Sequence, residues 1–101
     1  MSTAIDLTGQ VAFVTGSTRG IGRGIAEALY QAGSSVAVVG RNAEQAREVA
    51  STLGNRAIGV GCDVSQSDQV EAAIALAEET LGPISVLVNN AGVTRDNLLI
   101  R

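Results

Sequence analysis

The sequence of 101 residues predicts an α/β fold in which helices cover a parallel sheet. Three observations lead to this prediction. Short apolar segments alternate with longer segments of helical periodicity, in the order β-α-β-α-β-α-β. The second apolar segment contains the run Val36–Val39, and continuous apolar runs are typical of strands buried on both faces. A glycine-rich turn, 16–22, joins the first strand to the first helix, as in a Rossmann-type doubly wound sheet, for which we expect the strand order 3-2-1-4.

The elements of the first half follow from local patterns, taken in chain order. Segment 11–15 is apolar and follows a turn, so it is expected as the first strand. Apolar residues recur at helical spacing over 20–31, which predicts a helix that stops near Gly33. Segment 35–39 is the second expected strand, because its centre is a run of small and β-branched apolar residues.

The second half repeats the same alternation. The apolar positions of 43–53 lie on one face of a helix, with Asn42 as its N-cap and Gly54 just past its end. Segment 56–62 is the third expected strand, weakened by two glycines. The remaining predicted elements are a helix over 67–81, ended by Pro83, and a strand over 85–89.

Composition excludes several classes of function. The formal net charge is −3 and no basic stripe is present, so we expect no nucleic-acid partner. The chain has no histidine and one cysteine, Cys62, so we expect no metal site, no internal disulfide and a reducing, cytoplasmic compartment. Cys62 is interpreted as a small buried hydrophobe rather than a nucleophile. No apolar stretch reaches ~18 residues and the N-terminus does not resemble a signal peptide, so we expect no membrane partner.

The motif at 15–22 has the spacing Gly-x-x-x-Gly-x-Gly between a strand and a helix, and this context favours a dinucleotide-phosphate site. Gly16 allows a sharp turn, Gly20 allows the backbone to lie close to a pyrophosphate, and Gly22 allows the helix to pack on the sheet. The unpaired N–H groups at the helix start favour an anion. The alternative is a glycine-rich turn that binds nothing. The candidate cofactor-binding residues of this motif are Gly16, Ser17, Thr18, Arg19, Gly20, Ile21 and Gly22.

The end of the second strand indicates which dinucleotide binds. An acidic residue at this place favours NAD, whereas an arginine accommodates the 2′-phosphate of NADP. Here Val39-Gly40 is followed by Arg41, and Arg19 of the glycine-rich motif could reach the same phosphate. Two guanidinium groups facing a phosphate form charge-assisted hydrogen bonds. We therefore predict NADP(H) as the cofactor, the alternative being that both arginines are solvated surface charges.

Two further segments follow predicted strands, where ligands of open parallel sheets bind. Asp63 and Val64 follow the third strand, and the Asp63 carboxylate could accept a hydrogen bond from the adenine amino group. Asp63 also suits the start of a turn, and the two roles are compatible. The run Asn89, Asn90, Ala91 and Gly92 follows the fourth strand. By itself such a run indicates a turn, but at this distance from the glycine-rich motif it is a further candidate cofactor-binding segment.

These motifs resemble those of the short-chain dehydrogenase/reductase family, in which Thr-Gly-x-x-x-Gly-x-Gly, Asp-Val and Asn-Asn-Ala-Gly occur in this order. The continuation 92–99, Gly-Val-Thr-Arg-Asp-Asn-Leu-Leu, is similar to the 3-oxoacyl-(acyl-carrier-protein) reductases of fatty-acid synthesis. The resemblance implies transfer of hydride from NADPH to the 3-keto group of a carrier-bound acyl chain, giving a 3-hydroxyacyl thioester. It also implies a homo-oligomer for the complete enzyme.

The same resemblance implies catalytic residues that this sequence lacks. The family uses a Ser and a Tyr-x-x-x-Lys pair after the fourth strand, but the chain contains no lysine and its only tyrosine, Tyr30, lies in the first helix. We therefore assign no catalytic residue. Residues 1–101 are expected to be the N-terminal portion of one NADP(H)-binding domain, inactive alone. The alternatives are another short-chain ketone or alcohol oxidoreductase, a non-catalytic dinucleotide-binding protein, and an interaction module that pairs through its open sheet edge.

Overall fold

A computed structural model describes residues 5–90 of the chain, and it confirms the predicted α/β architecture. The four strands form one parallel sheet in the order β3-β2-β1-β4, as expected for the first half of a doubly wound sheet. All three helices have the predicted bounds. The elements are β1 (Val11–Thr15), α1 (Gly20–Gln31), β2 (Ser35–Gly40), α2 (Ala43–Leu53), β3 (Ala57–Gly61), α3 (Ser67–Leu81) and β4 (Val86–Val88).

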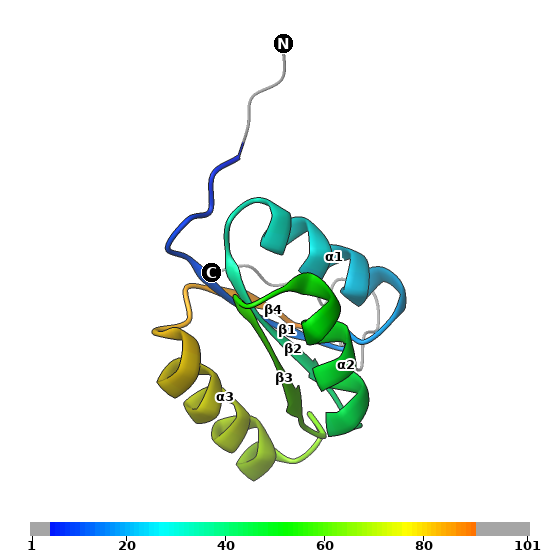
Figure 1. The fold of residues 1–101 in the computed structure, drawn as a ribbon. Helices are drawn as coiled ribbons and strands as arrows, with labels where there is room; N and C mark the ends of the chain where they lie inside the picture. Colours follow the sequence, from blue (N-terminus) through cyan, green and yellow to red (C-terminus); the bar gives the residue numbers. More distant parts are fainter. Residues whose placement is uncertain (1–4, 91–101) are drawn as a thin grey trace.

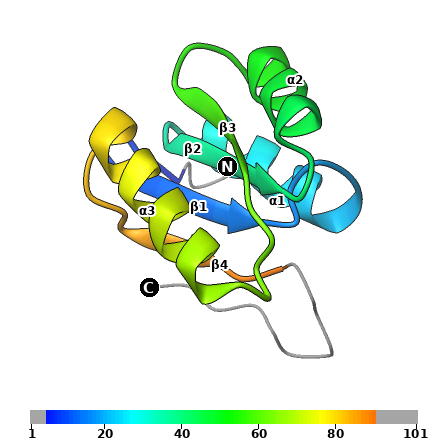
Figure 2. The ribbon, with the colours of Figure 1, turned by 90° about the horizontal axis from the view of Figure 1, so that it is seen from below.

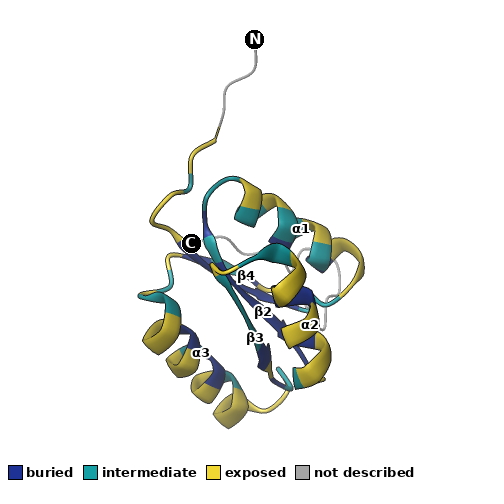
Figure 3. Ribbon diagram, in the orientation of Figure 1, coloured by how far each residue is buried: buried dark blue, intermediate teal, exposed yellow. Residues whose placement is uncertain are grey.

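The sheet lies between two layers of helices, with α1 and α2 on one face and α3 on the other (Figure 1). The view turned by 90° shows the same arrangement, in which α3 is the one helix of residues 5–90 on its side of the sheet (Figure 2). Colouring by burial shows that the two central strands, β1 and β2, are buried along almost their whole length (Figure 3). This arrangement explains why β1 and β2 are apolar on both faces.

Strand alternation divides the apolar residues between two cores. Ala12 and Val14 of β1 belong to the core under α1 and α2, whereas Phe13 belongs to the core under α3. Phe13 pairs in register with Ala37 of β2 and Leu87 of β4. Phe13, the largest buried side chain, therefore lies beside smaller partners on its neighbouring strands. Packed side chains cover both faces of the sheet.

The last strand is shorter than predicted. The sequence indicated a strand over 85–89, but β4 covers only Val86–Val88. Past Val88 the Asn90 backbone N–H donates to the Thr15 hydroxyl (2.8 Å) instead of to a strand carbonyl. The ladder ends there because side chains take over the pairing. The third strand is trimmed by one residue at each end, and β2 extends one residue further, to Gly40.

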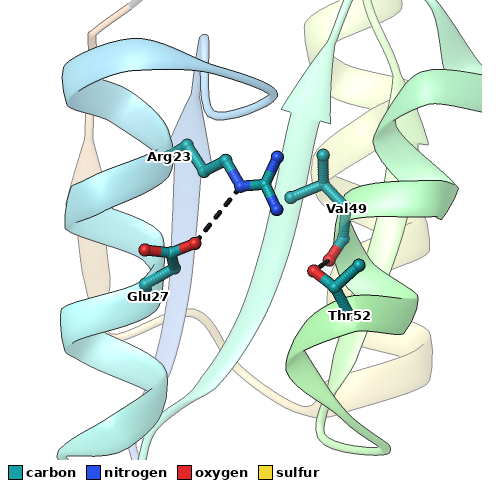
Figure 4. Close-up of polar contacts among 4 residues, drawn as sticks. All are labelled: Arg23, Glu27, Val49 and Thr52. Carbon is teal, nitrogen blue, oxygen red and sulfur yellow. Dashed lines mark hydrogen bonds and ion pairs between the residues drawn. The ribbon is translucent and has the colours of Figure 1, made fainter.

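The helices are stabilised by local side-chain contacts. Asn42 caps α2 as predicted, because its side-chain oxygen accepts from the Gln45 backbone N–H (2.9 Å). In α1, Arg23 Nε donates to Glu27 Oε2 (3.2 Å), and in Figure 4 the Arg23 guanidinium points from α1 toward α2 near Val49. Within residues 5–90, no helix is long and apolar enough to span a membrane.

One arginine joins the end of α1 to the loop before β3. The Arg56 guanidinium lies over the Tyr30 ring, 4.0 Å from its centroid, which is a cation–π geometry. Its Nη1 also donates to the Ser34 carbonyl oxygen (2.6 Å), at the start of β2. Arg56 thereby satisfies a carbonyl at the point where the chain passes from helix to strand.

We predict that Arg56→Ala lowers the free energy of unfolding by about 1–2 kcal/mol, because a charged hydrogen bond and a cation–π contact are both lost. Urea unfolding of the full natural chain measures this. Arg47→Ala is the matched control, since Arg47 is exposed on α2 and the change is expected to stay within about 0.5 kcal/mol. Equal effects of the two substitutions would show that the Arg56 contacts do not stabilise the fold.

Candidate functional site

A cleft of about 510 Å³ lies where β1, β2 and β3 end at the same edge of the sheet. Ligands of open parallel sheets bind at this edge. Three segments far apart in the sequence meet there: the glycine-rich loop, the loop after β2 and the loop after β3. The predicted site residues that line the cleft are Gly16, Thr18, Arg19, Arg41, Asp63 and Val64.

The glycine-rich loop turns sharply away from β1. Gly16 and Gly20 have φ of +61° and +64°, a left-handed conformation that favours glycine. Between them, Ser17 is 0% exposed, and its hydroxyl makes two hydrogen bonds inside the protein. Its hydroxyl donates to the Val14 carbonyl (2.7 Å) and accepts from the Val39 N–H (2.9 Å). Ser17 therefore fixes the loop to β2 and does not line the cleft, so its predicted cofactor contact stays untested.

The start of α1 presents unpaired backbone donors. The N–H groups of Gly20, Ile21 and Gly22 have no acceptor within the helix, and the Arg23 N–H donates to the Arg19 carbonyl (3.3 Å). No described side chain caps this end, and its first turn contains no acidic residue. The end is thus suited to an anion. The Ile21 side chain is 79% exposed, so we assign its candidate role to its N–H.

The sequence indicated that Gly22 lets α1 pack closely on the sheet. A Cβ built at position 22 would overlap the Gly16 carbonyl, just past β1, and would come within 2.6 Å of Asn90 Nδ2, just past β4. The missing side chain therefore lets α1 start close to the ends of these two strands.

The two asparagines join β4 to the glycine-rich loop. Asn90 Nδ2 donates to the Gly16 carbonyl (3.1 Å), and the Thr15 hydroxyl donates to Asn89 Oδ1 (3.2 Å). Neither asparagine lines the cleft, so the structure places them beside the loop that forms it. Ala91 and Gly92, and the rest of the segment up to Leu99, lie outside the described residues.

Positive charge reaches the cleft from two loops. Arg19 precedes α1 and Arg41 follows β2, and both are exposed and line the same cleft. The two residues therefore border one space, and their contact with a 2′-phosphate stays a prediction. Asn42 and Gln45, at the start of α2, also line it and were not predicted. The sequence could have indicated Gln45 as a cleft residue, because it lies in the first turn of a capped helix that follows β2.

Asp63 has the turn role that the sequence allowed. Its Oδ1 accepts from the Ser65 hydroxyl (2.7 Å) and from the Ser65 N–H (3.0 Å). These bonds, and then the nearby Arg41 charge, hold the pKa of the Asp63 carboxyl below its ordinary value, so the group is ionised at neutral pH. The contact with adenine stays a prediction. Val64 lines the cleft beside it.

Cys62 is buried, as predicted, with 2% of its surface exposed in the core under α3. Burial, followed by the charge of Asp63, raises the pKa of its thiol. The protonated thiol is a poor nucleophile, which agrees with the interpretation of Cys62 as a small hydrophobe. It also borders the cleft, a position that the sequence did not indicate.

Comparison with known proteins shows the family to which the chain belongs. Residues 10–100 match the model of the short chain dehydrogenase family, so the chain belongs to that family. The fold and the glycine-rich loop described above agree with this membership.

Individual members of this family are similar to the chain in sequence and in structure. The chain is 44% identical to the 3-oxoacyl-(acyl-carrier-protein) reductase FabG of Aquifex aeolicus, with 96% of this chain and 41% of the relative aligned. It is 38% identical to the crystal structure of 3-ketoacyl-(acyl-carrier-protein) reductase from Brucella melitensis complexed with NADH (TM-score 0.83; 87% of this chain, 36% of that one). It is 36% identical to a hydroxysteroid dehydrogenase from Escherichia coli (TM-score 0.83; 88% and 38%). The chain spans about two fifths of the length of the curated relatives it matches.

We predict that Gly22→Ala destabilises the protein by at least about 2 kcal/mol, because the added methyl overlaps the Gly16 carbonyl and the Asn90 amide. Gly24→Ala is the matched control in the same helix, since nothing lies within 4 Å of a Cβ there. It is expected to stabilise by about 0.5–1 kcal/mol through helix propensity. Thermal unfolding of the full natural chain measures both, and a neutral Gly22→Ala would contradict the packing described.

Proposed function

We propose that the protein reduces 3-oxoacyl-(acyl-carrier-protein) to 3-hydroxyacyl-(acyl-carrier-protein) with NADPH in fatty-acid synthesis. The observation that supports NADPH is the cleft itself, in which Arg19 and Arg41 from separate loops line one space beside the unpaired end of α1. The substrate is proposed from the similarity to relatives named as reductases of this substrate class. Membership of the short chain dehydrogenase family supports an oxidoreductase that uses a nicotinamide dinucleotide.

The residues present fit such a cofactor. The N–H groups at the start of α1 would donate to pyrophosphate oxygens, and Arg19 and Arg41 would form charge-assisted hydrogen bonds with the 2′-phosphate. The Asp63 carboxylate, ionised and partly used by Ser65, would accept from the adenine amino group. Asn90 would hold the glycine-rich loop in place through Gly16. The bound dinucleotide supplies the hydride.

We further propose that residues 1–101 form the N-terminal, cofactor-binding portion of a single domain. The absence of lysine supports this proposal, because the expected Tyr-x-x-x-Lys pair cannot lie within these residues. The acid that protonates the developing alkoxide would then come from the remainder of the domain. The complete enzyme is proposed to be a homo-oligomer that works in the cytoplasm, where the single cysteine remains reduced.

A second candidate is reduction of another ketone by the same cofactor site. The similarity to a hydroxysteroid dehydrogenase, at the same TM-score as the acyl-carrier-protein reductase, favours keeping it. Both candidate reactions would use the same cofactor cleft. A dinucleotide-binding protein without catalysis, or an interaction module pairing through β4, are the remaining alternatives.

We predict that the full natural chain oxidises NADPH with acetoacetyl-(acyl-carrier-protein), whereas residues 1–101 alone do not, because the catalytic acid is missing from them. Absorbance at 340 nm measures both reactions. A steroid ketone presented at the same concentration is the comparison substrate. Activity with the steroid alone would favour the second candidate, and turnover by residues 1–101 would contradict the division of the domain.

We also predict that Arg41→Asp lowers the NADPH/NADH ratio of kcat/KM about 10- to 100-fold, because a charge-assisted hydrogen bond is replaced by repulsion of the 2′-phosphate. Arg47→Asp is the matched control: it makes the same change of charge on α2, but Arg47 does not line the cleft. Steady-state kinetics of the full natural chain measures the ratio. Equal shifts in the two variants would show that net charge, and not position 41, decides the preference.

A further inference from the structure

Gly40 and Thr18 both line the cleft and are in close contact with each other. Gly40 is the last residue of β2 and is buried, and Thr18 lies in the glycine-rich loop. A Cβ built at position 40 would lie 2.6 Å from Thr18 Cγ2, but 3.5 Å from Thr18 Oγ1 and 3.6 Å from Thr18 Cβ. The methyl group alone therefore fills the place of a side chain at position 40, while the hydroxyl is at ordinary contact distance.

The other residues of β2 suit a strand better than Gly40 does. Four of the six residues of β2 are apolar, and three of them are β-branched valines, which suit a buried strand. Glycine weakens a strand and often marks the close approach of another backbone or a ligand. A side chain at position 40 would overlap the Thr18 methyl, and glycine avoids this overlap.

This contact joins two residues that each directly precede an arginine of the cleft. Arg19 directly follows Thr18, and Arg41 directly follows Gly40. The distance between the two backbone segments sets how far apart the backbones of Arg19 and Arg41 lie. A side chain at position 40 would push Thr18 away, because the facing core of β2 is buried and close-packed. Arg19 would then move with its neighbour.

We propose that Thr18 and Gly40 act together as one determinant of cofactor specificity, an inference that rests on the proposed NADPH site. The Thr18 methyl sets the spacing of Arg19 and Arg41 around the 2′-phosphate. It also occupies the space that a side chain at position 40 would need, including an acidic one able to bond the ribose hydroxyls of NADH. Changing the preference at position 40 therefore requires removal of the Thr18 methyl.

The test measures dissociation constants of NADPH and NADH by titration calorimetry in the full natural chain. Gly40→Ala is expected to weaken NADPH binding about tenfold. Adding Thr18→Ser, which removes the methyl and keeps the hydroxyl, is expected to return it to within about threefold of the unaltered protein. Thr18→Val, which keeps a methyl and removes the hydroxyl, is the matched control and is expected not to restore binding.

The acidic variants test specificity directly. Gly40→Asp alone is expected to weaken NADPH without improving NADH, whereas Gly40→Asp with Thr18→Ser is expected to bind NADH at least about tenfold tighter than Gly40→Asp alone. If Gly40→Ala does not fold alone, recovery of its circular-dichroism spectrum by Thr18→Ser but not by Thr18→Val supports the contact. Recovery by neither variant, or by both equally, overturns it.

The outcomes separate the inference from the function on which it rests. An unaltered protein that binds NADPH no tighter than NADH would overturn the proposed cofactor choice, and the inference with it. A protein that prefers NADPH but shows additive effects of the substitutions at positions 18 and 40 would overturn the inference alone.

Discussion

The buried hydroxyl of Ser17 is the interaction on which the geometry of the cleft depends. It accepts from the Val39 N–H and donates to the Val14 carbonyl, and its own N–H donates to the Val39 carbonyl (3.1 Å). These bonds continue the pairing of β1 and β2 into the loop, where the backbone would otherwise have unsatisfied groups away from water. Thr18 and Arg19 are placed against β2 because Ser17 is fixed there.

A second constraint is the lack of side-chain volume where elements approach most closely. Gly22 makes room for Asn90, and Gly40 makes room for Thr18. Gly61 ends β3, on the other edge of β2 from β1. A Cβ at Gly61 would lie 2.6 Å from the Cβ of Ala43, so α2 can start close to the end of β3. The cleft is therefore bordered by backbones held near one another, and its shape is set by packing as much as by the charged side chains.

Much of this arrangement could be predicted, and the rest depended on contacts between distant segments. The helix bounds and the Asn42 cap followed from periodicity and capping, which are local properties. The convergence of Arg19, Arg41 and Asp63 followed from the rule that parallel strands end at one edge. The role of Ser17 could not be predicted, because its partner Val39 is 22 positions away. The contact of Gly22 with Asn90 could not be predicted either, because Asn90 follows β4, far away in the sequence.

The central position of β1 has a consequence for biosynthesis. It is the first strand to be made and every residue in it is buried, yet its two neighbours come later. One edge can pair once β2 is complete at Gly40, but the other must wait for Val88. At translation rates of about 5–20 residues per second, that interval of about 48 residues lasts roughly 2–10 s. During it, an uncharged apolar strand has an unpaired edge, so the segment that organises the fold is also the one most in need of protection on the ribosome.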